Sequence, residues 1–170
     1  MNNKLNFIFS RRSIRGFKPT PVSDETVRDI LEAAMAAPSA VARDPWRFVV
    51  VRQQAIREKI VEQLPHGTML AQTPVGIIVC GDLEAAHDKQ LSYLLQDCSA
   101  AIENILLAVN ALGLGACWLG VHPREERIEH IKKVLELPPS VIPVSAIAIG
   151  YPNETKESRT RYNADYVQWR

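Results

Sequence analysis

Residues 91–120 read LSYLLQDCSAAIENILLAVNALGLGACWLG, and this stretch decides the fold. Up to Leu112 apolar residues recur at helical spacing, and alanines widen the apolar face. We therefore predict a long central helix that packs against a sheet and against a partner subunit. Gly113 and Gly115 end this helix, and residues 116–121 form a short strand.

The glycines of this stretch differ from a dinucleotide-binding fingerprint. Trp118 stands where the third glycine belongs, and the motif follows a helix rather than a strand. The flanking pattern supplies further elements on both sides of the stretch. Helices are predicted at 4–11, from the N-cap Ser23 to before Pro38, around 56–64, and at 125–136; strands are predicted at 47–52, 75–80 and 141–149. This order predicts an α+β sandwich rather than a doubly wound sheet, in a single domain that covers residues 1–170.

Composition narrows the class of protein. A formal net charge of +1 over 170 residues argues against a general nucleic-acid or membrane-surface binder. The apolar run 5–9 is too short for a secretory signal, so we expect a cytoplasmic protein. The three cysteines, at 80, 98 and 117, are widely spaced in apolar settings, which indicates buried free thiols. No metal site is predicted, and no side chain is assigned as a catalytic acid, base or nucleophile.

A basic cluster near the start of the chain carries the first functional signal. Arg11, Arg12, Ser13 and Arg15 lie within five residues. Guanidinium groups meet phosphate oxygens in pairs, and a hydroxyl adds a further donor. Cations this close repel one another unless an anion lies among them. The alternative is a solvated basic turn or a set of salt bridges.

Three further segments each carry a weaker signal. In the loop 38–46, Pro38 stiffens the backbone, and Ser39 and Ala40 are small enough for a flat ring to approach; a plain helix-to-strand connector is the alternative. The glycine-rich strand that ends at Leu119 and Gly120 permits close approach of a ligand, although it also fits a buried strand. Arg159 and Arg161 point the same way along an extended chain and could close over one anion, or belong to a solvated tail.

Taken together, these motifs resemble the FMN-dependent nitroreductase family. The resemblance runs from Phe7 to Trp169 and rests on motif order and spacing. Its motifs are RRSIRGF, the Pro-Ser and Pro-Trp loop, DCSAAIEN at 97–104, GLGACWLG at 113–120, Gly-Tyr-Pro at 150–152, and the late Arg-Thr-Arg. It implies a three-layer sandwich with a mixed, mainly antiparallel sheet flanked by helices. It also implies an obligate homodimer whose C-terminal tails are exchanged between subunits.

The resemblance also implies the roles of individual residues. Arg11, Arg12, Ser13 and Arg15 would hold the phosphate and ribityl end of FMN, and Arg159 and Arg161 would complete that cradle. Pro38, Ser39 and Ala40 of the other subunit would border the isoalloxazine ring. Leu119 and Gly120 would lie beside the ring near its reactive nitrogen. The four histidines, at 66, 87, 122 and 130, fall in no matching motif and are predicted at the surface.

The implied activity is electron transfer from NAD(P)H through FMN to a nitroaromatic, a quinone or a similar acceptor in a ping-pong cycle. Two positions depart from the family pattern: Ala42 replaces an asparagine and Asp44 a glutamine. Alanine removes a hydrogen-bond partner, and a charged Asp44 near the ring would disfavour negative charge on the reduced flavin. A flavin-binding store, sensor or scaffold without efficient turnover therefore stays an alternative, as does another flavin reaction such as reductive dehalogenation.

Overall fold

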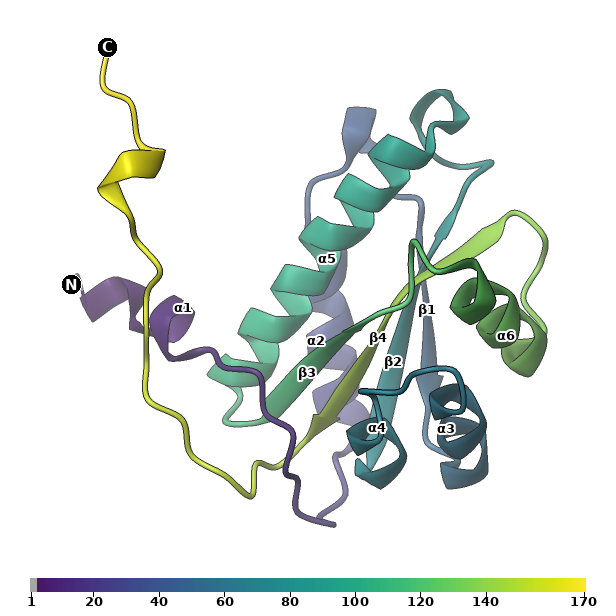
Figure 1. Cartoon of the computed structure of the whole chain (residues 1–170), viewed down its shortest axis with the longest axis horizontal. Coiled ribbons are helices and arrows are strands. Elements are labelled where there is room, and N and C mark those ends of the chain that lie inside the picture. The colour runs from purple at the N-terminus through teal and green to yellow at the C-terminus, as the bar shows by residue number, and fades with distance from the viewer. Residues whose placement is uncertain (1–2) are drawn as a thin grey trace.

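A four-stranded sheet forms the middle layer of the molecule (Figure 1). The computed structural model describes residues 3–170. The strands are β1 (Trp46–Val51), β2 (Val75–Asp82), β3 (Gly115–Gly120) and β4 (Val141–Gly150). They lie in the order β1-β2-β4-β3, and each neighbouring pair is antiparallel. The two central strands are buried on both faces, as their continuous apolar sequences require.

One face of the sheet is covered by two helices, α2 (Asp24–Met35) and α5 (Leu91–Ala111). The Ser23 hydroxyl accepts a hydrogen bond from the Thr26 amide at 3.1 Å, so the predicted N-cap is confirmed. Helix α5 buries Ile102 and Ile105 completely, together with most of its predicted apolar face. The long helix therefore packs centrally on the sheet, as its sequence predicts.

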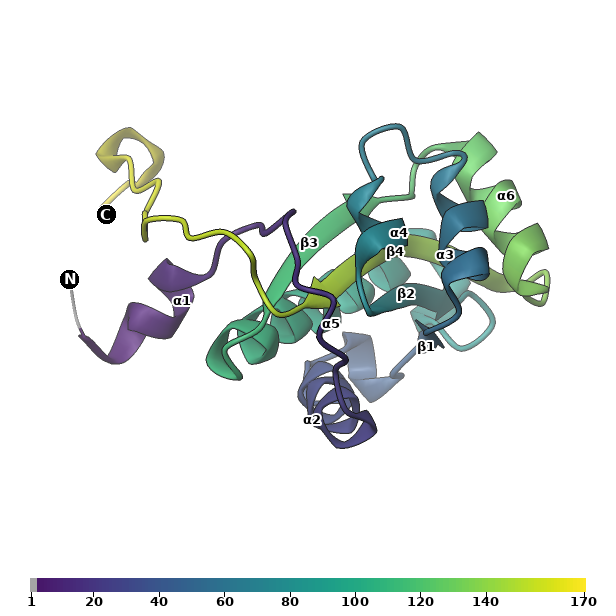
Figure 2. The same ribbon diagram turned by 90° about the horizontal axis from the view of Figure 1, so that it is seen from below.

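The other face carries three shorter helices, α3 (Gln54–Val61), α4 (Met69–Gln72) and α6 (Glu125–Leu135). Figure 2 shows these helices above the sheet and α2 and α5 below it. Each face has its own apolar core. The three-layer α+β sandwich with its antiparallel sheet is thus confirmed, whereas α4 was not predicted.

The two ends of the chain leave the sandwich together. A short 3-10 turn (Asn3–Leu5) and helix α1 (Asn6–Ser10) lie beside the extended tail that follows β4, in both views (Figures 1 and 2). The tail contains one further 3-10 turn, Ala164–Tyr166. Two hydrogen bonds join these segments where they leave the sandwich. The Lys18 amide donates to the Tyr151 carbonyl at 2.8 Å, and the Asn153 amide donates to the Gly16 carbonyl at 2.9 Å.

The cysteines are buried and unpaired, as predicted. Burial raises the pKa of Cys80 to about 12, and burial is also the main cause that raises the pKa of Cys98 to about 12. At neutral pH these thiols are therefore protonated and chemically inert. No helix within residues 3–170 is long and apolar enough to cross a lipid bilayer.

Candidate functional site

The basic segment is held in place by the edge strand β3. The Ile14 amide donates to the Ala116 carbonyl at 2.9 Å, and Ser13 pairs with Ala116 in a parallel bridge. The Ile14 side chain is buried, Arg15 beside it is exposed, and Arg11 and Arg12 are half-buried. We call residues 11–16 the N-terminal arm. Its conformation follows from one apolar anchor among polar neighbours.

The C-terminal tail folds back along this arm. Lys156 donates from Nζ to the Ser13 carbonyl at 2.7 Å, and the Arg12 guanidinium donates to the Glu157 carbonyl. Farther along, the Arg159 amide donates to the Phe9 carbonyl at 3.2 Å. These contacts join residues that are more than 140 positions apart in the chain.

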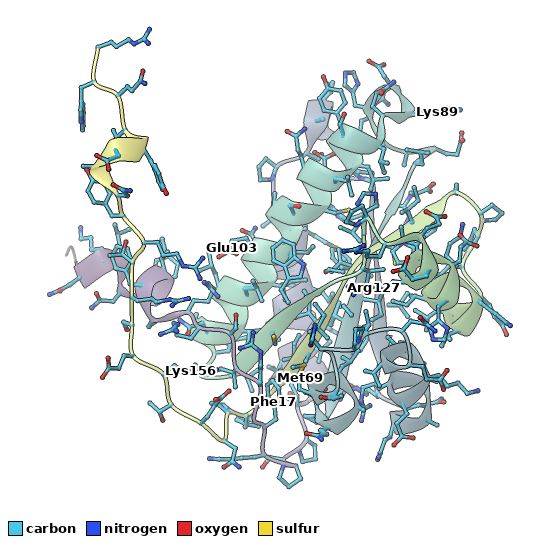
Figure 3. The ribbon with its side chains drawn as sticks, viewed as in Figure 1. Phe17, Met69, Lys89, Glu103, Arg127 and Lys156 are labelled. Atoms are coloured by element: carbon cyan, nitrogen blue, oxygen red, sulfur yellow. The ribbon has the colours of Figure 1, made fainter. Side chains whose placement is uncertain are left out.

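The arm and the tail enclose a cavity of about 540 Å³, here called the basic cavity. Six of the predicted site residues line it: Arg11, Arg12, Ser13, Arg15, Arg159 and Arg161. Lys156 adds a sixth cation to the five arginines, and Glu103 of α5 is the one acidic residue in the lining. Figure 3 labels Glu103 and Lys156 at the two sides of this region. The structure therefore brings the two predicted basic segments together.

The charges in the basic cavity are not balanced. Arg11 forms an ion pair with Glu103 at 3.5 Å. Within residues 3–170, the guanidiniums of Arg15, Arg159 and Arg161 have no hydrogen-bond or ion-pair partner. Repulsion by Arg161, and to a smaller extent by Arg12, lowers the pKa of Arg159. A site that crowds guanidiniums and offers one carboxylate is suited to an anion with several oxygens, such as a phosphate monoester.

The remaining predicted strand residues line a second cavity of about 270 Å³, here called the β3 cavity. Leu119 and Gly120 lie in its wall, and Arg15 lines both cavities. Gly120 has open space where a side chain would begin, because nothing lies within 4 Å of an added Cβ. A flat group could therefore approach the backbone at the end of β3 while its charged end reached the basic cavity past Arg15.

The loop residues Pro38, Ser39 and Ala40 line neither cavity. They follow α2, and a 3-10 turn, Ala40–Ala42, begins within them. The Ala40 amide donates to Oδ1 of the buried Asp97 at 2.9 Å. Ser39 Oγ donates to Asp44 Oδ1 at 2.5 Å and accepts from the Asp44 amide at 2.9 Å. Within one chain this loop is thus separate from the other predicted site residues.

The loop backbone is unusual. Val41, Ala42 and Asp44 have φ angles of 53°, 51° and 50°, in the left-handed region that side chains other than glycine rarely adopt. Strain of this kind persists only where surrounding contacts fix it. Here the Asp97 carboxylate accepts a hydrogen bond from the Ala40 amide, and the Asp44 carboxylate accepts one from the Ser39 hydroxyl within the loop.

Sequence reasoning did not identify several of the residues that shape the site. Lys156 belongs to no motif and reaches the basic cavity only because the tail folds back. Asp97 lies within a family motif, but the motif gave no sign of its contact with the loop. Arg127 and His66 enter the β3 cavity from α6 and from the connection between α3 and α4. His66 is exposed, as predicted, but His87, His122 and His130 are half-buried rather than fully at the surface.

The comparisons with known proteins agree on one family. The family model described as the nitroreductase family matches residues 8–67 and 61–151. A protein of Methanothermobacter thermautotrophicus, provisionally named NADH dehydrogenase/NAD(P)H nitroreductase, is 45% identical over 163 residues, which cover 96% of this chain and 84% of the relative. The chain therefore belongs to the nitroreductase family.

Two solved structures show the same architecture. The crystal structure of a protein of Parabacteroides distasonis with the same provisional name has a TM-score of 0.92 and 37% identity, and covers 99% of this chain and 98% of its own. A provisionally assigned nitroreductase of Desulfovibrio desulfuricans, solved in complex with FMN, has a TM-score of 0.86 and 35% identity. That match covers all of this chain and 98% of the other, so the FMN-containing protein is comparable over its full length.

Proposed function

We propose that the protein is an FMN-dependent NAD(P)H oxidoreductase whose basic cavity holds the FMN phosphate. The observation that carries the proposal is the convergence of six cations from both ends of the chain on one cavity, next to a strand end open to a flat ring. When bound, FMN supplies hydride acceptance from NAD(P)H and electron transfer to an acceptor. The family relationship and the FMN complex of the Desulfovibrio relative support the same assignment.

The chain's own residues have distinct tasks in this proposal. Arg159 and Arg161, whose guanidiniums lack partners within residues 3–170, would meet the phosphate, while Arg12 and Lys156 hold the tail against the arm. Arg15 would lie where the ribityl chain passes from one cavity to the other. Backbone at Leu119 and Gly120 would lie against the ring. Donor and acceptor would use this site in turn, which is the ping-pong scheme, with a nitroaromatic, a quinone or a similar compound as acceptor.

A homodimer would complete the site. Helix α1 exposes Phe7 and Ile8, and an apolar groove of about 360 Å³ runs between α1, α2 and α5, lined in part by Leu107 and Ala111. Trp169 in the tail is 89% exposed. Exposed apolar surfaces of this kind favour association with a second copy through an exchanged tail, which would bring Pro38, Ser39 and Ala40 to the partner's ring. We also propose that the protein is located in the cytoplasm.

The test is a visible absorption spectrum of the purified protein, before and after FMN addition and then after NADH under anaerobic conditions. We expect a flavin spectrum that bleaches with NADH. A bound flavin that NADH does not bleach would favour a store or sensor. A protein that refuses FMN would overturn the proposal.

A double variant, Arg159→Ala with Arg161→Ala, tests the assignment of the cavity. Each lost charged hydrogen bond to phosphate costs roughly tenfold to a hundredfold in affinity. We therefore expect much weaker FMN binding with an unchanged thermal transition of the apoprotein, because both residues are exposed. Arg124→Ala, at an exposed position just before α6 and outside both cavities, is the control. Equal FMN affinity in all three proteins would place the phosphate elsewhere.

A further inference from the structure

The β3 cavity has an unusual charge composition. Its ten lining residues include Arg15, His66, Trp118 and Arg127, and the others are apolar residues or glycines. Two of these residues carry permanent positive charge, one is a histidine, and none is acidic. The walls are otherwise apolar, and Trp118 is 39% exposed. Apolar walls with cations and no carboxylate favour a ligand that is both flat and negatively charged.

The position of Arg127 separates it from the phosphate-binding residues. Arg15 lines both cavities and so lies where they adjoin, whereas Arg127 and His66 line the β3 cavity alone. Arg127 reaches from α6 toward the end of β3, and Figure 3 shows it well away from Lys156 of the basic cavity. A group that met Arg127 would therefore bind beyond the ring, as seen from the phosphate.

One hydrogen bond orients the Arg127 guanidinium, and its other N–H donors are not used within residues 3–170. Its Nη1 donates to the Gly120 carbonyl at 2.8 Å, and within residues 3–170 its guanidinium has no other side-chain or backbone partner. A guanidinium carries five N–H donors. One bond therefore orients the group and leaves donors free for a carboxylate, which arginine meets in a paired geometry.

We propose that the β3 cavity selects an anionic acceptor, a flat aromatic compound that carries a carboxylate or a similar group, and that Arg127 is the residue that reads this charge. The proposal rests on the proposed function, because it assigns the substrate class of the same site. Each two-electron reduction of a nitro group to a nitroso group oxidises one NADH, takes up one proton and releases one water. The charge of the acceptor is not altered by this step, so its carboxylate stays on Arg127 throughout.

The experiment compares 4-nitrobenzoate with 4-nitrobenzamide, which has nearly the same shape but no charge. Holoenzyme is supplied with NADH, and kcat/KM is measured for each acceptor. We expect the wild-type protein to prefer the anion. In Arg127→Gln we expect kcat/KM for 4-nitrobenzoate to fall about 10- to 100-fold, with a change of less than about threefold for the amide. Arg124→Gln, on the same stretch but outside the cavity lining, is the matched control and should behave as wild type.

A binding measurement keeps the test independent of turnover. Unreactive benzoate is titrated into oxidised holoenzyme and followed by its perturbation of the flavin spectrum, and FMN content is measured for each variant. We expect the dissociation constant for benzoate to rise in Arg127→Gln while FMN content stays the same. If NADH fails to bleach the flavin of the wild-type protein, the proposed function fails, but the benzoate titration still decides whether the cavity binds anions.

Three results would overturn the inference. Equal benzoate affinity in wild type and Arg127→Gln would mean that Arg127 does not read charge. Loss of FMN, or an equal slowing with both acceptors, would mean that Arg127 serves the cofactor. If Arg127→Gln raised only the KM for NADH, Arg127 would bind the negatively charged electron donor rather than the acceptor.

Discussion

The sandwich body and the two chain ends are stabilised by different means. In the body, side chains such as Ile105 and Ile147 are fully buried between helices and sheet. In the ends, Phe7 is 45% exposed, Tyr166 and Trp169 are largely exposed, and a few hydrogen bonds hold arm and tail together. The body therefore folds by its own burial, whereas the ends bring charged groups together and leave apolar surface for another molecule. The proposed cofactor site lies where the two regions meet.

The largest expected effect is in the body. Ile105→Ala removes buried atoms from the core between α5 and the sheet. Substitutions of this kind cost about 2–5 kcal/mol, because the surroundings collapse only partly onto the space that is left. Denaturant unfolding at a fixed protein concentration measures the change. A loss below about 0.5 kcal/mol, the usual size for surface positions, would contradict the packing described for α5.

Gly115 tests the junction between the arm and the body. A Cβ at this position would lie 2.8 Å from the Ile14 Cβ, too close for either residue to stay in place. We expect Gly115→Ala to cost about 1–3 kcal/mol by overpacking and to weaken FMN binding, because Ser13 and Arg15 flank the displaced side chain.

Gly120→Ala is the matched control, since nothing lies within 4 Å of its added Cβ. It should leave stability nearly unchanged and yet lower FMN affinity, because the new methyl group enters the β3 cavity. Equal stability loss in both alanine variants would contradict the tight contact between Ile14 and β3.

Replacing Asp97 tests whether its hydrogen bond with the Ala40 amide holds the strained loop in place on the body. Asp97→Ala leaves the Ala40 amide without its acceptor, and a lost bond of this kind costs about 1–3 kcal/mol. We expect that amide to exchange its hydrogen about 5- to 100-fold faster, measured by hydrogen exchange. Asp29→Ala, at an exposed position of α2, is the control. Unchanged exchange at Ala40 would mean that the loop is fixed without Asp97.

The body was largely predictable from the sequence, and the site only in part. Periodic apolar residues predicted α5 and the central strands, because burial on one or both faces leaves a clear pattern. Helix α4, at Met69–Gln72, is too short to show a period. Lys156 and Arg127 enter their cavities through tertiary folding, and no local pattern marks such residues. The bond between Asp44 and Ser39 shows the same limit: both residues were singled out, but their contact depends on a loop backbone that sequence does not reveal.

The Glu154 carboxylate joins the tail to the N-terminal arm, and the pH dependence of this contact can be tested. Its Oε1 accepts from the amides of Arg15, at 2.5 Å, and Gly16, at 3.1 Å. The bond from the Arg15 amide is the main cause that lowers the pKa of Glu154 below its ordinary 4.5. A carboxylate with a lowered folded-state pKa stabilises the protein fully above the unfolded value, and this contribution is lost as pH falls through the folded pKa. The join should therefore loosen only below about pH 4.5.

The measurement is an NMR titration of the Arg15 and Gly16 amide signals. In the wild-type protein we expect both signals to shift with a midpoint below the ordinary glutamate value. In Glu154→Gln the shift should disappear, with a small loss of stability, because the Glu154 side chain is 32% exposed and solvent screens part of its interactions. A midpoint at or above the ordinary value would show that the carboxylate is not held by the arm.

Trp169→Ala should have the smallest effect on folding of the chain. It is also the most direct test of whether the tail packs on a second copy. The side chain is 89% exposed, so its removal should change the free energy of unfolding by less than about 0.5 kcal/mol under conditions where the chain is monomeric. If the tail packs on a second copy, the same change removes an aromatic contact from that interface and raises the dimer dissociation constant. Sedimentation over a range of concentrations measures this constant, and Val50→Ala, at an exposed position of the edge strand β1, shows the effect of losing an apolar side chain from the body. A variant that loses stability as a monomer would mean that the tail packs on its own chain, whereas unchanged association would mean that Trp169 does not reach a partner.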